Sequence, residues 1–94
     1  MRYAYKHLTG SQVISPSPTT VVSVVVTSDG GGVADITLYN GESTNDDRLI
    51  KLKAGTDSTR ALRFSFGLYL SKGLYIDVGS NVESVLVVYI SEPE

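Results

Sequence analysis

The sequence predicts an all-β protein, a single antiparallel β-sandwich of the jelly-roll or immunoglobulin-like kind with seven or eight short strands. Valine, threonine and tyrosine, which favour strands, are abundant in the 94 residues, whereas the helix formers alanine, glutamate and lysine are sparse. Apolar segments recur about every 8 to 14 residues, with glycine, proline, asparagine or aspartate between them. The connections are too short for parallel crossovers, so we expect antiparallel strands.

Chain length and turn signals predict one domain with two short appendages. Residues 1–8 form an N-terminal arm or a first edge strand, residues 9–91 the sandwich domain, and residues 92–94 a polar tail. Both interpretations of the arm stay open, because chain ends are ordered only where they are tied down. The chain has no cysteine, so no disulfide can stabilise its small core. Small folds without such cross-links often gain stability by oligomerising.

Alternation along each segment predicts which side chains face the core. The residues expected to face inward are Val22, Val24 and Val26; Ala34, Ile36 and Leu38; Ile50, Leu52 and Ala54; Leu62, Phe64 and Phe66; and Leu74, Ile76 and Val78. Both phenylalanines of the chain belong to this set, which predicts that they lie at the core centre. Lys51 and Lys53 alternate with core residues and are typical of an edge strand that is protected against aggregation.

The last third of the chain is expected to form a hairpin from residues 73–79 and 84–91, joined by a turn at residues 79–81. The second of these strands is unusual because both of its faces are apolar. One face is Leu86, Val88 and Ile90, and the other is Val85, Val87 and Tyr89. We assign the first face to the core, which leaves the second pointing outward.

Apolar residues outside the assigned core are too numerous for one sandwich interior, which predicts a subunit interface. The predicted interface residues are Val21, Val25, Tyr39, Tyr75, Val85, Val87 and Tyr89. The alternatives are that these residues are scattered over the surface, or that a closed barrel or the N-terminal arm covers them. Tyr3 and Tyr5 make that arm a candidate docking arm for a neighbouring subunit.

The sequence carries no catalytic signature, so neither an enzyme nor a cofactor is expected. His7 is the only histidine, and no Gly-x-Ser-x-Gly motif occurs. Asp35 and Asp77 are single outward residues rather than the paired carboxylates of a glycosidase. The glycines at 30–32 follow Asp29 as in a hairpin turn, and they lack the lysine and the serine or threonine of a phosphate-binding loop.

Metal, nucleic-acid and membrane binding are not expected either. Asn45, Asp46 and Asp47 offer oxygen atoms to calcium, but their spacing differs from that of an EF-hand, which favours a solvated loop tip. The net charge of −2 gives no electrostatic reason to expect nucleic acid. No apolar run reaches the ~20 residues of a membrane span.

Several stretches resemble small β-rich proteins of tailed bacteriophages. These stretches are Tyr-Lys-His-Leu near the start, Thr-Val-Val-Ser-Val-Val-Val-Thr-Ser, Ile-Thr-Leu-Tyr-Asn-Gly, Lys-Gly-Leu-Tyr-Ile at 72–76, and the closing Val-Leu-Val-Val-Tyr. Proteins of this kind are virion-associated, as capsid decoration, head-fibre or tail-type components. The resemblance covers most of residues 3–90. It implies a non-enzymatic structural protein in a homo-oligomer, and it implies no site residues.

The pattern and the resemblance together predict a viral structural protein of the virion, assembled in the host cytoplasm through an apolar outer sheet face. The expected partners are further copies of the chain, with a trimer favoured, and other virion proteins such as the capsid protein. The alternative is a β module that binds a glycan or a host surface through loop 41–47 and exposed tyrosines. An apolar outer sheet favours assembly, whereas a tyrosine-lined groove near the loop tips favours a ligand.

Overall fold

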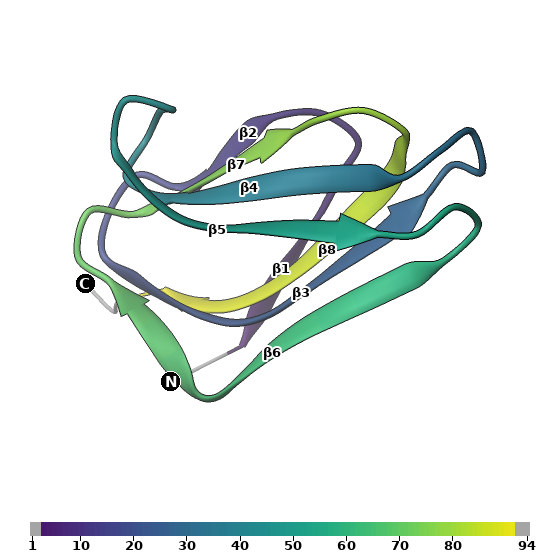
Figure 1. Cartoon of the computed structure of the whole chain (residues 1–94). Coiled ribbons are helices and arrows are strands. Elements are labelled where there is room, and N and C mark those ends of the chain that lie inside the picture. Colours follow the sequence, from purple (N-terminus) through teal and green to yellow (C-terminus); the bar gives the residue numbers. More distant parts are fainter. Residues whose placement is uncertain (1–2, 92–94) are drawn as a thin grey trace.

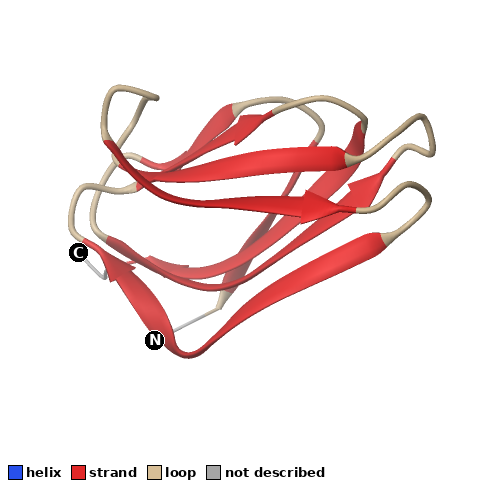
Figure 2. Cartoon of the chain, viewed as in Figure 1, coloured by secondary structure: helices blue, strands red, loops and turns tan. Residues whose placement is uncertain are grey.

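The computed structural model describes residues 3–91 and consists of eight strands in two facing antiparallel sheets (Figure 1). The strands are β1 (Ala4–Leu8), β2 (Gln12–Ser15), β3 (Thr19–Ser28), β4 (Ala34–Asn40), β5 (Asp47–Ala54), β6 (Thr59–Leu70), β7 (Leu74–Val78) and β8 (Val82–Ser91). Sheet A has the order β1-β8-β3-β6, and sheet B has the order β2-β7-β4-β5. The predicted all-β sandwich is confirmed, and Figure 2 shows that the described residues form strands and loops.

Within residues 3–91, no helix is long and apolar enough to cross a membrane. The predicted polar tail, residues 92–94, lies outside the described residues, as do residues 1 and 2 of the predicted arm.

The strand pairing is that of one long antiparallel hairpin that has been rolled up. β1 pairs with β8, β2 with β7, β3 with β6 and β4 with β5. Rolling this ladder adds the pairs β3–β8 and β4–β7 and divides the strands between two sheets. This is the jelly-roll arrangement, so the chain adopts the first of the two sandwich types that its sequence predicts.

The predicted hairpin in the last third is wrong. β7 belongs to sheet B and β8 to sheet A, so the turn between them carries the chain across the sandwich. The Gly79 N–H donates to the Asp35 carbonyl oxygen at 2.9 Å, and the Ser80 N–H donates to the Asp35 carboxylate at 3.2 Å. The glycine turn at residues 29–32 also crosses from sheet A to sheet B. Turn residues specify where the chain reverses, but tertiary packing decides which strand it then joins.

The inner faces of the two sheets form one apolar core. Its most deeply buried side chains include Leu8, Val21, Val24, Val26, Ile36, Leu38, Leu70, Leu74, Ile76, Val85 and Val87. The inward faces predicted for β4 and β7 are confirmed by the burial of Ile36, Leu38 and Ile76. In the described part of the chain, every buried side-chain nitrogen or oxygen has a hydrogen-bond partner.

The face assignment of β8 is inverted relative to the prediction. Val85 and Val87 are completely buried and Tyr89 is only 8% exposed, so these residues form the inner face. The other set, Leu86, Val88 and Ile90, points away from sheet B. Alternation cannot choose between two apolar faces, and the choice follows from the pairing of β8 with β1 and β3.

A β-bulge in β3 changes a second face assignment. Val21 lies opposite Tyr89 and Ser23 lies opposite Val88, so Val22 is an extra residue in β3. Val21 therefore joins Val24 in the core, whereas Val22 leaves it.

β6 leaves its ladder at residues 64–67, which we call the β6 lip. Leu68 pairs with Val21 and Arg63 pairs with Ser23, so the lip spans the position of the bulge in β3. Phe64 packs against the core, but Phe66 is fully exposed at a relative area of 101%. The prediction that both phenylalanines lie at the core centre is therefore wrong, because it assumed an unbroken ladder.

The edges of the sheets agree with parts of the sequence prediction. β5 is an edge strand of sheet B, as Lys51 and Lys53 predict, although a bulge near Leu49 leaves Ile50 38% exposed instead of in the core. Residues Ala4–Leu8 form an edge strand of sheet A that pairs with β8 of the same chain.

Candidate assembly surface

The surface with the clearest functional character is the outer A face, which is the side of sheet A that points away from sheet B. Strand pairing arranges its side chains in four rows. Three rows contain apolar residues and are His7–Leu86–Val25–Ala61, Tyr5–Val88–Ser23–Arg63 and Ile90–Thr20–Tyr69. The fourth row, Ser84–Thr27–Thr59, is polar and lies at one end of the face. Val22, at the bulge of β3, adds a further aliphatic side chain to this face.

The outer A face carries a band of apolar side chains across its middle. Leu86, Val88 and Ile90 form an aliphatic ridge along β8, of which Leu86 is 36% exposed. Tyr5 and Tyr69 stand near the two edges of the face, at 72% and 57% exposure. Within the four rows, Arg63 is the only lysine, arginine, aspartate or glutamate. Such a face differs from the polar outer face that a solvated antiparallel sheet normally presents.

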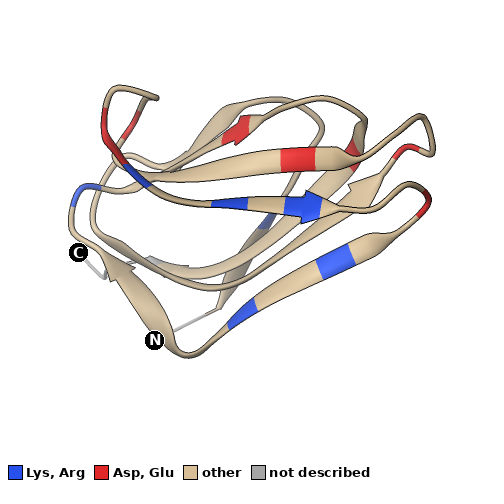
Figure 3. Cartoon of the chain, viewed as in Figure 1, with Lys and Arg blue, Asp and Glu red and all other residues tan. Residues whose placement is uncertain are grey.

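The outer face of sheet B has the opposite character, as Figure 3 shows by the charged residues on β4 and β5. Lys51 Nζ lies 3.5 Å from Asp35 Oδ2 across these two strands. In sheet A, by contrast, β3 has no charged residue and β8 has only Glu83, near its start. One face of the sandwich is therefore suited to water and the other to a partner.

The structure divides the seven predicted interface residues among three places. Val21, Val85, Val87 and Tyr89 are buried in the core, which corrects their assignment to an outer surface. Val25 lies on the outer A face, opposite Leu86.

Tyr39 and Tyr75 occupy the third place, the outer face of sheet B. They pair across β4 and β7 with ring centroids 6.0 Å apart. The predicted set therefore does not form a single surface.

The two tyrosines of the candidate docking arm lie at the rim of the outer A face. Tyr5 pairs with Val88 from the edge strand β1, and Tyr3 directly precedes that strand. Both side chains are well exposed, at 69% for Tyr3 and 72% for Tyr5.

Sequence reasoning missed the residues that carry the apolar face. Leu86, Val88 and Ile90 were assigned to the core, and Phe66 was placed at its centre. The signal that a partner surface exists was present in β8, because both of its faces are apolar. The sequence did not show which face is the outer one, since a bulge in β3 and the lip in β6 are set by tertiary pairing.

The loops that offered candidate ligands form internal hydrogen bonds. The Glu42 N–H donates to Asp46 Oδ2 at 2.8 Å, and the Gly31 N–H donates to Asp29 Oδ1 at 2.8 Å. Asp77 accepts a hydrogen bond from the Ser11 hydroxyl at 3.0 Å. Within residues 3–91, no group of three or more histidine, aspartate or glutamate side chains is placed to hold a metal ion.

Comparisons with known proteins show a likeness to solved structures but none to a protein family. No family model and no curated protein matches the chain. Among solved structures, the chain is similar to the coat protein of Tobacco streak virus, with a TM-score of 0.41 and 6% sequence identity over 99% of this chain and 88% of that one. The function must therefore be inferred from the surfaces of the chain itself.

Proposed function

We propose that the protein is a non-enzymatic structural component of a virion that assembles with copies of itself through the outer A face. The observation that carries this proposal is the aliphatic ridge of Leu86, Val88 and Ile90 on a face that has one charged residue in its four rows. A small domain that has neither a disulfide nor a large core gains stability from such an interface.

Burial of the ridge supplies an adequate driving force. Fully burying an aliphatic side chain contributes about 1.5–3 kcal/mol relative to exposure. Neighbouring residues already cover part of Val88 and Ile90, so each contributes on the order of 1 kcal/mol on association. Several such residues from each copy are enough to determine the state of assembly.

The virion setting is supported by the fold class and by the resemblance to tailed-phage proteins. Double-sheet jelly rolls occur in viral capsid proteins as well as in lectins, so the fold alone does not decide between these classes. The proposed role is capsid decoration or another position on the particle, with the capsid protein as partner and assembly in the host cytoplasm. We expect capsid or tail genes next to this gene. We also expect mass spectrometry of purified particles to detect the chain.

Sedimentation velocity tests the assembly surface directly. The wild-type chain is expected to sediment as an oligomer at micromolar concentration, and Val88→Asp as a folded monomer, because a carboxylate cannot be buried in an apolar contact. Val33→Asp is the matched control, since it makes the same substitution at an exposed valine just before β4 of sheet B. A wild-type monomer, or equal dissociation by both variants, would contradict the proposed surface.

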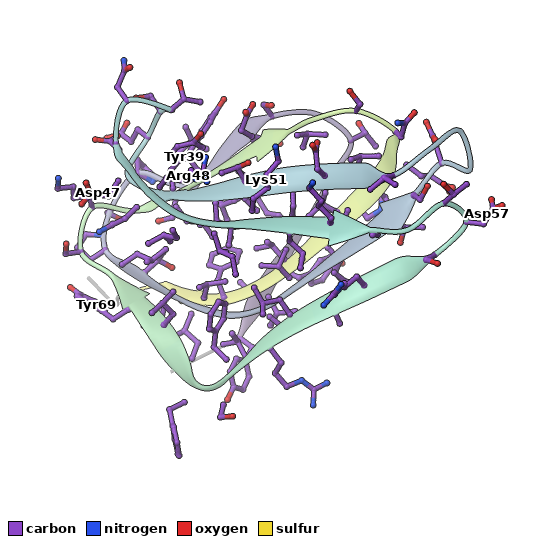
Figure 4. All side chains as sticks on the ribbon, viewed as in Figure 1. Tyr39, Asp47, Arg48, Lys51, Asp57 and Tyr69 are labelled. Carbon is purple, nitrogen blue, oxygen red and sulfur yellow. The ribbon has the colours of Figure 1, made fainter. Side chains whose placement is uncertain are left out.

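The second candidate function is binding of a glycan or a host surface by the outer face of sheet B. Tyr39 pairs with Tyr75 and comes just before loop 41–47, and Figure 4 shows Tyr39 close to Arg48 on this side of the molecule. Aromatic rings next to polar and cationic groups are suited to sugar binding. Binding on a glycan array that is lost in Tyr75→Ala would favour this function, whereas an array without signal at millimolar affinity would exclude it.

A further inference from the structure

The two edges of the outer A face differ in shape. On one edge, the β6 lip carries the fully exposed Phe66. Figure 1 shows β6 bending sharply at the lowest point of the ribbon, on the side away from sheet B. On the other edge, β1 and the residue before it present Tyr5 and Tyr3. The face therefore has a projecting rim and an aromatic rim.

The lip is a built feature of the strand. Gly67 has a φ of 79°, a conformation that side-chain-bearing residues rarely adopt. A Cβ atom at Gly67 would lie 2.5 Å from Thr20 Cγ2, so β6 returns to the sheet in close contact with β3. Phe66, next to this contact, has its apolar side chain fully exposed, and a binding partner would bury that area.

The middle of the face also has two unequal halves. β8 contributes the large side chains Leu86, Val88 and Ile90. In the same rows, β3 contributes the smaller Val25, Ser23 and Thr20, with Val22 at the bulge beside Ser23. A ridge along β8 therefore runs beside a lower strip along β3, and Val22 is the one larger side chain near the middle of that strip.

A two-fold axis parallel to the strands would bring these unlike parts together. It would set β8 of one copy against β3 of the other, so that each ridge would lie on the lower strip. It would also set β6 against β1. The β6 lip falls between the row of Arg63 and the level of Leu68, which corresponds to the levels of Tyr5 and Ala4 on β1. In such a dimer, Phe66 would meet Tyr5 and Tyr3 of the other copy.

Arg63, the one charged residue of the rows, is also compatible with this arrangement. Arg63 and Tyr5 belong to the same row on opposite edges. The same two-fold axis would bring Arg63 to the level of Tyr5 of the other copy. A guanidinium group stacks favourably on an aromatic ring, so the one cation of the face does not oppose the contact.

We infer that the partner of the outer A face is a second copy of this chain in a face-to-face two-fold dimer, with Phe66 of each copy seated between Tyr3 and Tyr5 of the other. The inference rests on the proposed function and names its contact. With strands about 4.8 Å apart and about 3.4 Å per residue, four strands and the length of β8 give a flat area on the order of 600 Å². A stable interface needs about 800 Å² of accessible surface per partner, which this area and the lip together approach.

A two-fold contact is isologous and closes on itself, so its unit is a dimer. It departs from the trimer that the sequence favoured. The sedimentation mass separates the two, since each chain contributes 10.1 kDa.

Disulfide trapping tests the contact, because the chain has no cysteine of its own. The single variants Phe66→Cys and Tyr5→Cys are mixed under mild oxidation. The yield of cross-linked dimer from the mixture is expected to exceed the yield from either variant alone by about tenfold or more. In the double variant, the two positions lie on opposite edges of one sheet, about 14 Å apart. A disulfide needs Cα atoms within about 7 Å, so cross-links must join two chains.

The control pair is Phe66→Cys with Lys53→Cys, which lies on the other sheet and is expected to give only background cross-linking. An oligomer that forms in sedimentation but shows no excess of the 5–66 cross-link would overturn the two-fold contact and leave the proposed function intact. A wild-type chain that sediments as a monomer would overturn both the two-fold contact and the proposed self-assembly, even if a capsid protein binds the same face.

A truncation of the lip residue gives an independent measurement. Phe66→Ser is expected to raise the dimer Kd by about tenfold or more, as for an aromatic residue at an interface hot spot. Its monomer should melt at the wild-type monomer temperature, because Phe66 makes no buried contact in the single chain. An unchanged Kd would contradict the inference.

Discussion

Two adjacent valines of β8 show how strongly position governs the role of a residue in this chain. Val87 is completely buried between the sheets, whereas Val88 lies half-buried on the outer A face. The two side chains are identical, and only the direction set by the strand differs. Val87 therefore contributes to the folding of one chain, and Val88 is available to a second one.

The matched pair Val87→Asp and Val88→Asp separates folding from assembly. Val87→Asp is expected to cost about 3 kcal/mol or more, because it places a carboxylate in an apolar core. Val88→Asp should leave the stability of the monomer within about 1 kcal/mol of wild type. Urea denaturation followed by circular dichroism measures both values at a concentration below the dimer Kd. Equal losses of stability in the two variants would contradict the assignment of Val87 to the core and of Val88 to the outer A face.

Gly73 is the residue at which backbone conformation matters most for the link between β6 and β7. Its φ is 118°, and a Cβ atom there would meet the carbonyl oxygen of Ser15 in close contact. Backbone cannot move aside as a flexible side chain can, so only glycine fits this position.

We expect Gly73→Ala to lower the free energy of unfolding by about 2 kcal/mol or more. Gly10→Ala is the control, because a Cβ atom at Gly10 has no neighbour within 4 Å. The control should change stability by less than about 0.5 kcal/mol. Thermal unfolding of both variants measures the difference, and a Gly73→Ala protein as stable as the control would contradict the assigned contact.

At the scale of elements, the connection between β7 and β8 depends on β4. Asp35 accepts hydrogen bonds from the Gly79 N–H through its carbonyl oxygen and from the Ser80 N–H through its carboxylate. The same carboxylate pairs with Lys51 at 3.5 Å. One residue thus holds the turn that moves the chain from sheet B to sheet A.

Asp35→Ala and Asp35→Asn distinguish these two contributions. The alanine variant loses the side-chain hydrogen bond and is expected to cost about 1 kcal/mol. The asparagine variant keeps an acceptor for Ser80 and loses only a partly exposed ion pair, worth a few tenths of a kcal/mol, ~0.5 at most. Urea unfolding measures both variants. If asparagine costs as much as alanine, the ion pair matters more than the turn.

At the scale of the whole molecule, β1 pairs with β8, so the first and last described strands close the same sheet. The outer A face exists only after β8 has paired with β3 and β1 has paired with β8. Folding and assembly are therefore linked, since a partner that binds only the native chain stabilises it by mass action.

Thermal stability is accordingly expected to depend on protein concentration. A tenfold increase around the dimer Kd should raise the wild-type Tm by a few degrees, on the order of 2–6 °C for a domain of this size. Val88→Asp should show no such dependence. Differential scanning calorimetry over a range of concentrations provides the measurement, and a wild-type Tm that is constant with concentration would be inconsistent with self-association.

The sequence by itself determined the class of the fold, most of the strands and the existence of an apolar surplus. These follow from local physical chemistry: strand-favouring side chains, a period of two, and turn residues between segments. The inward faces of β4 and β7 were predictable for the same reason, because each has one apolar face and one mixed or polar face.

Only the tertiary structure decided which face of β8 is the inner one, which turns cross the sandwich and where Phe66 lies. Both faces of β8 are apolar, so alternation gives two equivalent answers, and the pairing with β1 and β3 selects one. The bulge at Val22 and the β6 lip each shift the register, and a shift of one residue exchanges the two faces of a strand. Such shifts depend on residues distant in sequence, so local patterns cannot specify them.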